Sequence, residues 1–207
     1  MSKAPPLLQI KELARPMLGP VNLSVNAGEC LCITGPSGGG KSLLLRAIAD
    51  LDPHAGEVLL DGIPAQDVEP EQWRRQVGLL PPESSWWLPQ PGDHFHNGMP
   101  VSLEQLGLAD SILQQPVSRL SSGERQRLAL LRLLANQPGV LLLDEPTANL
   151  DPDNTQRVER VIADYLDRYR AAVIWVSHDR SQVQRVASRH LELDHGAFRD
   201  QAVELHT

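Results

Sequence analysis

The stretch that decides the fold runs Gly35-Pro36-Ser37-Gly38-Gly39-Gly40-Lys41-Ser42 and satisfies the pattern G-x-x-x-x-G-K-[ST]. An apolar run at 30–34 precedes it, and apolar residues at helical spacing follow it over 41–51. Glycines let the backbone turn tightly, so that successive N–H groups and the start of the helix face phosphate oxygens. Lys41 would then bridge the β and γ phosphates, and the Ser42 hydroxyl would ligate Mg²⁺. The sequence therefore predicts a nucleotide-binding loop from Gly35 through Leu43.

Strands alternate with helices along most of the chain. Buried strands are predicted at 30–34, 77–80, 140–143 and 172–176, with a last strand at 190–193. Helices are predicted at 41–51, 70–76, 121–136, 151–169 and 179–187, with two weaker helical segments before Gln115. This alternation predicts an α/β fold whose mostly parallel sheet is covered on both faces. Short strands at 7–11, 21–25 and 57–60 add an antiparallel portion.

Composition excludes several classes of protein. The 207 residues carry a formal charge of −7, which argues against a protein that coats nucleic acid or anionic lipid through its overall field. The longest apolar runs are far shorter than the roughly 20 residues that span a bilayer, and no secretory signal is visible at the start. Cys30 and Cys32 cannot build a disulfide framework, so we expect a cytosolic protein in which both are small core residues.

A second motif, Val140-Leu141-Leu142-Leu143-Asp144-Glu145, ends four apolar residues in two carboxylates. A buried strand would deliver Asp144 to its carboxyl end, where ligands bind in open α/β sheets. Asp144 would hold the metal, and Glu145 could accept a proton from an attacking water. Taken alone, the pattern also fits an ordinary strand followed by an acidic turn.

Five motifs in order give the chain its resemblance to a known family. The phosphate loop, LSSGERQR at 120–127, LLLDEP at 141–146, ANLD at 148–151 and VSHD at 176–179 resemble those of ATP-binding cassette (ABC) ATPases. The resemblance covers essentially the whole chain. It implies a P-loop NTPase fold in a single ABC ATPase domain over 1–207. The RecA-like core would take 1–81 and 137–207, and a shortened helical signature subdomain would take 82–136.

The resemblance also assigns roles to individual residues. Ser121 and Gly123 match the signature positions that contact the γ-phosphate of ATP held by the other cassette; the alternative is that Ser121 is an ordinary helix cap. His178 matches the switch histidine that reaches the γ-phosphate and holds Glu145 and the water in place. The segment ending at Asp151 resembles the loop that crosses the dimer interface, although Asp151-Pro152 is also a standard helix opening. The resemblance thus implies a head-to-tail homodimer around two ATP molecules, each with Mg²⁺.

Two features of the family are missing. The loop after residues 77–81 usually carries a Gln that touches Mg²⁺, but Pro82 stands there, with Glu83 one position later as the alternative. The family also stacks an aromatic residue on adenine from the region 12–17. Only Leu13, Arg15 or Met17 are candidates for that contact here.

The Pro-rich segment after Pro81 is a candidate partner surface. Trp86 and Trp87 cannot both point into one core, so an exposed apolar patch is expected. In the family this surface receives a short helix of the membrane permease; local packing within the small subdomain is the alternative. His94 and His96 are expected in a solvated loop rather than a metal site. Three arginines are expected on a solvated helix face: Arg125, Arg127 and Arg132.

Together these features predict the ATP-binding and hydrolysing subunit of an ABC transporter. It would be cytoplasmic and peripheral on the inner face of the membrane, with a separate permease and no nucleic-acid partner. A narrower resemblance to bacterial export cassettes, including metal efflux types, rests on LLQI and VIWVSHD. The alternative is a non-transport or regulatory ABC ATPase with weak or no turnover, which Pro82 and the missing aromatic favour. The cargo and the direction of transport are not specified by these residues.

Overall fold

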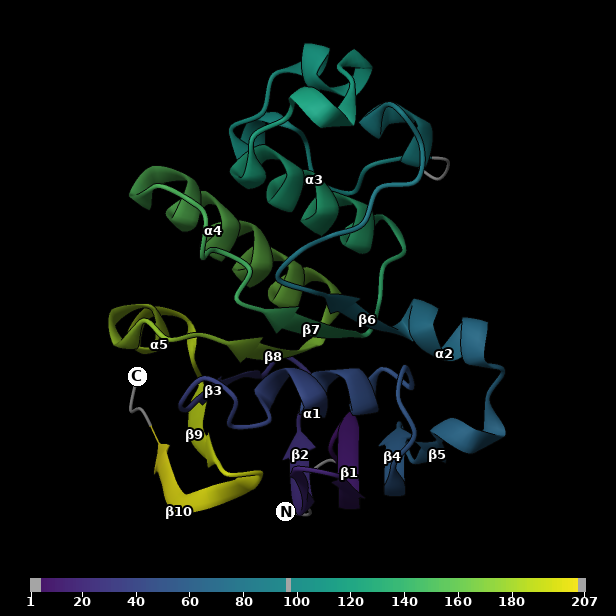
Figure 1. The fold of residues 1–207 in the computed structure, drawn as a ribbon, viewed down its shortest axis with the longest axis vertical. Helices are drawn as coiled ribbons and strands as arrows, with labels where there is room; N and C mark the ends of the chain where they lie inside the picture. Colours follow the sequence, from purple (N-terminus) through teal and green to yellow (C-terminus); the bar gives the residue numbers. More distant parts are fainter. Residues whose placement is uncertain (1–4, 96–97, 205–207) are drawn as a thin grey trace.

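The structure, a computed structural model, describes residues 5–95 and 98–204 and contains two sheets in that part of the chain. The larger sheet has the strand order β10 (Ala197–Glu204), β9 (Arg189–Asp194), β3 (Cys30–Thr34), β8 (Ala172–Val176), β7 (Val140–Asp144) and β6 (Val77–Leu80). Neighbours from β9 to β6 are parallel, and β10 returns antiparallel to β9. This sheet crosses the middle of the molecule (Figure 1).

The smaller sheet is antiparallel and lies at the lower end of Figure 1. Its order is β2 (Leu18–Val25), β1 (Leu8–Arg15), β4 (Ala55–Leu60) and β5 (Ile63–Pro64). The predicted antiparallel portion is therefore confirmed. Both early strands are longer than predicted, because β1 continues through Glu12 with a register irregularity and turns into β2 at residues 16–17.

Helices cover both faces of the larger sheet. Their bounds are α1 (Lys41–Ile48), α2 (Pro70–Gln76), α3 (Ser122–Ala135), α4 (Pro152–Tyr169) and α5 (Arg180–Val186). Helix α1 lies between the two sheets, whereas α3 and α4 lie on the opposite face of the larger one (Figure 1). The longer helices begin at side-chain caps: Ser121 accepts from the Glu124 N–H, and Asp151 accepts from the Asn154 N–H.

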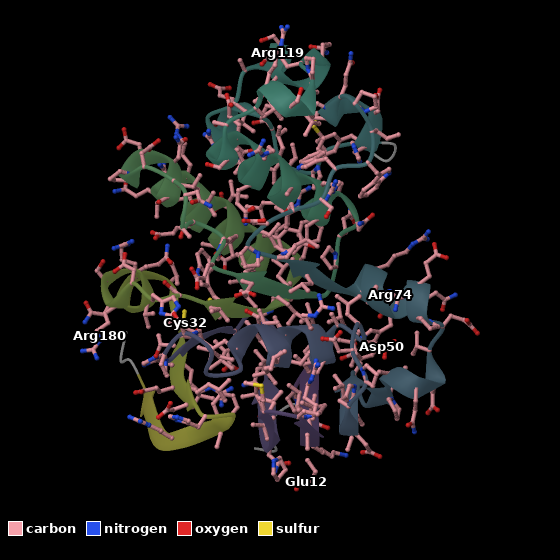
Figure 2. All side chains as sticks on the ribbon, viewed as in Figure 1. Glu12, Cys32, Asp50, Arg74, Arg119 and Arg180 are labelled. Carbon is pink, nitrogen blue, oxygen red and sulfur yellow. The ribbon has the colours of Figure 1, made fainter. Side chains whose placement is uncertain are left out.

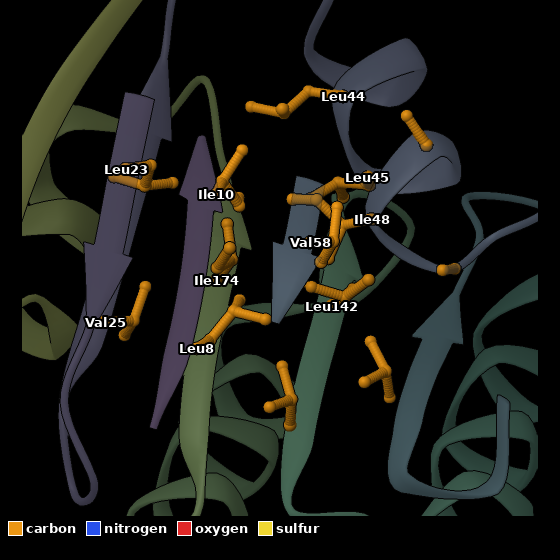
Figure 3. Packing of buried hydrophobic residues seen from close by; sticks show 14 of the residues in the cluster. Leu8, Ile10, Leu23, Val25, Leu44, Leu45, Ile48, Val58, Leu142 and Ile174 are labelled. Atoms are coloured by element: carbon orange, nitrogen blue, oxygen red, sulfur yellow. The ribbon is translucent and has the colours of Figure 1, made fainter. Parts of the chain in front are cut away.

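Alternation along the central strands divides the core in two. Leu142 of β7 and Ile174 of β8 face α1 and the smaller sheet, as Figure 3 shows beside Leu45, Ile48 and Val58. Their neighbours in sequence join α3 and α4 in the second cluster. All five residues of β7 and of β8 are buried, which makes this sheet the rigid base of the molecule. Cys30 and Cys32 are buried in the second cluster, in agreement with the core role predicted for them; Figure 2 labels Cys32.

The predicted fold class is confirmed, but two local predictions are wrong. The two weak helical segments predicted before Gln115 are present as the short 3₁₀ helices η3 (Glu104–Leu106) and η4 (Asp110–Gln114), and α3 is the one α-helix between residues 82 and 136 in the described part. The 3₁₀ turns are η1 (Ala65–Asp67), η2 (Pro91–His94), η3 (Glu104–Leu106), η4 (Asp110–Gln114) and η5 (Val117–Arg119). Strand β10 was not predicted, because charged residues interrupt its apolar pattern. Among the described residues, no helix is both long and apolar enough to cross a bilayer.

The second error concerns two arginines of α3. Arg127 is only 7% exposed, and its guanidinium donates to the Leu106 carbonyl at 2.8 Å and to Asn154 Oδ1 at 2.5 Å. Arg132 lies under two aromatic rings and donates to the Ser85 carbonyl at 3.0 Å. The two side chains therefore fix the Pro-rich segment and α4 to α3 instead of forming a solvated face.

Candidate active site

The turn between β3 and α1 is held open by glycine geometry. Gly35 has φ 139°, and a Cβ there would lie 1.9 Å from the Leu193 carbonyl oxygen. Gly40 has φ 100° and begins α1 without any side-chain cap. The first N–H groups of α1 thus have no side-chain acceptor, and Pro36, Ser37 and Gly38 are exposed above them. Such a turn can accept the oxygens of a phosphate.

Lys41 folds back over this turn from the first position of α1. Its Nζ donates to the carbonyl oxygens of Gly35 and Pro36, at 2.9 Å each. Burial lowers the pKa of Lys41, while the nearby carboxylates of Glu145 and Asp144 oppose that shift. The ammonium is therefore already positioned inside the loop. Its present partners are two neutral carbonyls, and a phosphate would give it an anionic partner and stronger hydrogen bonds.

Asp144 and Ser42 meet beside the loop. Strand β7 delivers Asp144 in register with the last residue of β8, and its carboxylate accepts a hydrogen bond from the Ser42 hydroxyl. Burial raises the pKa of Asp144, and the Ser42 hydrogen bond opposes that shift. A buried carboxylate and a hydroxyl are hard oxygen donors of the kind Mg²⁺ prefers, and a cation would relieve the cost of keeping Asp144 charged. The residues present fit a magnesium ion. Leu43, next in sequence, is half-buried.

Glu145 and His178 form a pair at the same edge. His178 Nε2 lies 3.0 Å from Glu145 Oε1, and both side chains are partly exposed. Glu145 has φ 51°, a left-handed conformation that is uncommon for residues other than glycine, and its N–H donates to the Val176 carbonyl at 3.2 Å. The carboxylate is thus held next to the imidazole, outside the buried position of Asp144.

Ser121 and Gly123 lie at the start of α3, away from this group. The Ser121 hydroxyl and N–H both donate to the Glu124 carboxylate at 2.8 Å, which closes a capping box. These bonds, the backbone one first, lower the pKa of Glu124, so its carboxylate stays charged. Within the described residues, no hydrogen bond or ion pair joins Ser121 or Gly123 to Lys41 or Asp144. The structure therefore does not bring the signature residues to the phosphate loop of their own chain.

The three candidates for a base contact differ in availability. Leu13 is buried in the core, and Arg15 pairs with Asp52 at 2.6 Å. Met17 is 74% exposed, and its carbonyl oxygen lies 3.4 Å from where a Cβ on Gly40 would stand. Met17 is thus the candidate that lies free beside the phosphate loop.

The loop after β6 carries the two candidates for the missing Gln. Pro82 and Glu83 are both exposed, and no hydrogen bond or ion pair involving Glu83 occurs in the part of the chain that the structure describes. The buried Gln126 of α3 instead donates to the Pro81 carbonyl at 3.3 Å. The loop is therefore linked to the signature helix by its backbone.

Sequence analysis missed one buried polar residue near the site. Gln182 of α5 is 3% exposed and hydrogen-bonds residues that adjoin both Glu145 and His178. No sequence signal marked it, since a glutamine four residues after a histidine is not a motif. Its contacts exist only once α5 has packed on the sheet.

Comparisons with known proteins agree with this geometry. A family model described as "ABC transporter" matches residues 18–148. The chain is 36% identical over 201 residues to the probable iron export ATP-binding protein FetA of Escherichia coli (strain K12), covering 88% of this chain and 89% of FetA. It is 38% identical over 191 residues to the lipoprotein-releasing system ATP-binding protein LolD of Maricaulis maris (strain MCS10), covering 83% of each. A dimeric structure of MJ0796, a bacterial ABC transporter cassette, superposes with a TM-score of 0.82 at 25% identity, covering 97% of this chain and 99% of that one.

The first prediction concerns binding at the loop. ATP with Mg²⁺ at a hundredfold excess over its Kd should add about 2.7 kcal/mol to the free energy of unfolding of the wild-type chain. Lys41→Met should lose most of this gain, because the ammonium in the loop is gone. Urea unfolding with and without nucleotide measures it. Lys11→Met, which removes an exposed lysine, is the matched control and should keep the gain. An undiminished gain in Lys41→Met would contradict the assignment.

Proposed function

The chain belongs to the ABC transporter family, and from this membership we propose that two copies close head to tail around two ATP molecules to drive a separate membrane permease. Members of this family hydrolyse ATP to power transport, and this chain is such an ATP-binding subunit. One observation carries the proposal: Lys41, Ser42, Asp144, Glu145 and His178 gather at one edge of the sheet, whereas Ser121 and Gly123 lie elsewhere on the chain. The site is complete only when a second copy supplies the signature residues.

Binding would use the loop from Gly35 to Leu43. Its N–H groups would cradle the phosphates, and Lys41 would leave the Gly35 and Pro36 carbonyls to bridge the β and γ phosphates. Ser42 and Asp144 would hold Mg²⁺, which when bound neutralises charge on the β and γ oxygens. Met17 is the residue we assign to the adenine face, as a flexible thioether in place of an aromatic ring.

Hydrolysis would proceed by in-line attack of water on the γ-phosphorus. Glu145 would accept a proton from the water while the water oxygen forms a bond to the γ-phosphorus. The bond between the γ-phosphorus and the β–γ bridging oxygen would break at the same time, leaving ADP and phosphate. His178, 3.0 Å from Glu145, would keep the carboxylate aimed at the water and contact the γ-phosphate. Rate acceleration on this scheme comes mainly from positioning and charge neutralisation.

The second copy would close the site through the start of α3. Its Ser121 hydroxyl and the N–H groups near Gly123 would face the γ-phosphate with the positive end of the helix. The exposure of Ser121, together with the dimeric form of the MJ0796 cassette, supports this arrangement. Glu124 keeps its charge at the same helix start, so closure also brings a carboxylate toward the phosphates.

Replacing the proposed base separates binding from turnover. Glu145→Gln should lower ATP turnover at least about a hundredfold, because the amide cannot take the proton from water. ATP should still bind, so the variant should accumulate as an ATP-bound dimer on a sizing column. Glu71→Gln, on the exposed face of α2, is the matched control and should behave as wild type.

If Glu145→Gln retains ATP turnover, Glu145 is not the base that accepts the proton of the water. A monomer in saturating ATP with Mg²⁺ would contradict the closed dimer.

The permease would dock in a groove between α2, β6 and α3. This groove has a volume of about 430 Å³ and is lined by Leu51, Arg74, Trp87 and Arg132 among others. Trp87 is 70% exposed, while Trp86 packs against the second core cluster, so only one of the two tryptophans points outward. The expectation that His94 sits in a solvated loop is wrong, since its ring packs edge-on against both indoles; His96 lies outside the described residues.

Charge in the groove indicates what the docking segment carries. In a chain of net charge −7, the groove is lined by two arginines and, among the described residues, by no carboxylate. Arg74 Nη1 lies 3.7 Å from Asp50 Oδ2, and both residues are labelled in Figure 2. Burial under the indoles lowers the pKa of Arg132. We therefore expect a permease segment that sets an apolar side chain on Trp87 and a carboxylate near Arg74. In this arrangement the subunit is cytoplasmic, on the inner face of the membrane, without nucleic acid.

The docking surface has its own test. Trp87→Ala should weaken association with the permease by about thirtyfold, the effect of losing an aromatic residue central to an interface. A tagged chain is purified from detergent-solubilised membranes, and the polytopic membrane protein bound to it is quantified by mass spectrometry. Ile63→Ala, which truncates another exposed apolar side chain on β5, is the control and should retain the partner. Equal recovery with Trp87→Ala would contradict this surface.

A further inference from the structure

We propose that Gln182 is a positioning residue that links the segment after β7 to the segment after β8, and so holds Glu145 and His178 in register for hydrolysis. The inference rests on the proposed function, because it assumes that these two residues act on the water and the γ-phosphate. It adds a residue that no sequence motif marks.

The amide of Gln182 is fully engaged. Its Oε1 accepts from the Ser177 hydroxyl at 2.9 Å, and its Nε2 donates to Thr147 Oγ1 at 2.9 Å. Nε2 also donates to Glu159 Oε1 at 2.9 Å. Ser177 immediately precedes His178, and Thr147 lies two residues after Glu145. One buried side chain therefore touches both segments that carry the candidate catalytic pair.

Apart from the Glu145–His178 contact itself, few bonds join the two segments in the described part of the chain. The Glu145 N–H donates to the Val176 carbonyl at 3.2 Å, at the end of the strand ladder. Beyond that point, residues 145–150 form a series of turns stabilised by two local bonds, from Ala148 N–H to Glu145 and from Leu150 N–H to Thr147. Glu145 is also in the left-handed region, which a neighbouring constraint must maintain. The Thr147–Gln182–Ser177 chain provides such a constraint.

Glu159 fixes which way the amide points. Its carboxylate accepts from Arg185 Nε at 3.0 Å and Nη2 at 2.7 Å, and its side chain is largely buried against α5. Because a carboxylate only accepts, it selects the NH₂ end of Gln182, which leaves Oε1 for Ser177. Ser177 in turn accepts from the Asp179 N–H at 3.0 Å, so the backbone on both sides of His178 is held.

The link also reaches the dimer interface. Thr147 immediately precedes residues 148–151, the segment that resembles the family's loop across the dimer interface. A shift of this segment on closure would pass through Thr147 and Gln182 to Ser177 and then to His178. A cavity of about 540 Å³ borders the link and leaves room for such a shift. Gln182 would thus make hydrolysis in one site depend on how closely the partner approaches.

Three variants test the link in ATPase assays of the full chain. Gln182→Met keeps the length of the side chain but removes the amide, while Thr147→Val and Ser177→Ala each remove one hydroxyl. Each should lower kcat by about tenfold or more, the scale seen when groups that orient a catalytic residue are lost. KM for ATP should change by less than about twofold, because no phosphate contact is removed. Gln182→Met combined with Thr147→Val should fall no further than Gln182→Met alone, since both break one chain of bonds.

Tyr165→Phe is the matched control for stability. It deletes a buried hydrogen bond to the Pro138 carbonyl, 2.8 Å long, that lies outside this chain of bonds. It should leave kcat per folded molecule at the wild-type value. If Gln182→Met does not fold, the two hydroxyl deletions carry the test alone.

The outcomes separate this inference from the proposed function. A wild-type chain without ATPase activity would overturn the proposed function. An active wild type whose three variants keep kcat within twofold, or change KM alone, would overturn only the role of Gln182. A tenfold loss in kcat at constant KM, absent in Tyr165→Phe, supports it.

Discussion

Parallel pairing of β3, β8 and β7 is the constraint on which the rest of the structure depends. Neighbouring parallel strands end at one edge of a sheet, and the register here pairs Ile33 and Asp144 with Val176. The residues at or just after the ends of these strands therefore lie together at that edge. They are the glycine turn with Lys41, the carboxylates of Asp144 and Glu145, and His178. Since β7 and β8 are buried along their whole length, the positions from which these side chains extend are fixed by packing.

The site contains charged side chains that the folded chain alone does not fully pair with opposite charges. Burial lowers the pKa of Lys41 and raises that of Asp144, so each group is held where its charged form is costly. A triphosphate and a divalent cation offer the missing partners. At the start of α3 the situation is reversed, since Ser121 is exposed and already capped by Glu124. The phosphate-loop side of the site thus favours a ligand, and in the proposed dimer the exposed start of α3 would face the ligand of a second copy.

Sequence reasoning was most reliable where one local signal decides the outcome. Helix α2, with Pro70 at its first position, has the predicted bounds, as do strands β6 and β8. Lys41 and Ser42 were predictable from the phosphate-loop pattern, and Asp144, Glu145 and His178 were predictable from their places at or just after the end of a strand. Sequence reasoning was least reliable where tertiary contacts determine whether a side chain is buried and what it bonds to. The sequence predicts an exposed Arg132, but in the fold its guanidinium lies against the rings of Trp86 and Trp87. No sequence pattern marks Gln182, because its hydrogen bond to Thr147 forms only when α5 packs on the sheet.

Mixing two inactive variants tests the shared site most directly. Lys41→Met disables the phosphate loop, and Ser121→Asp keeps the cap of α3 while setting a carboxylate against the γ-phosphate. In a head-to-tail pair of one chain of each kind, one site contains both defects and the other contains neither. Since half of the dimers in an equal mixture are of this kind, the mixture should regain about a quarter of wild-type turnover. A mixture as inactive as either variant alone would contradict a site built by two copies.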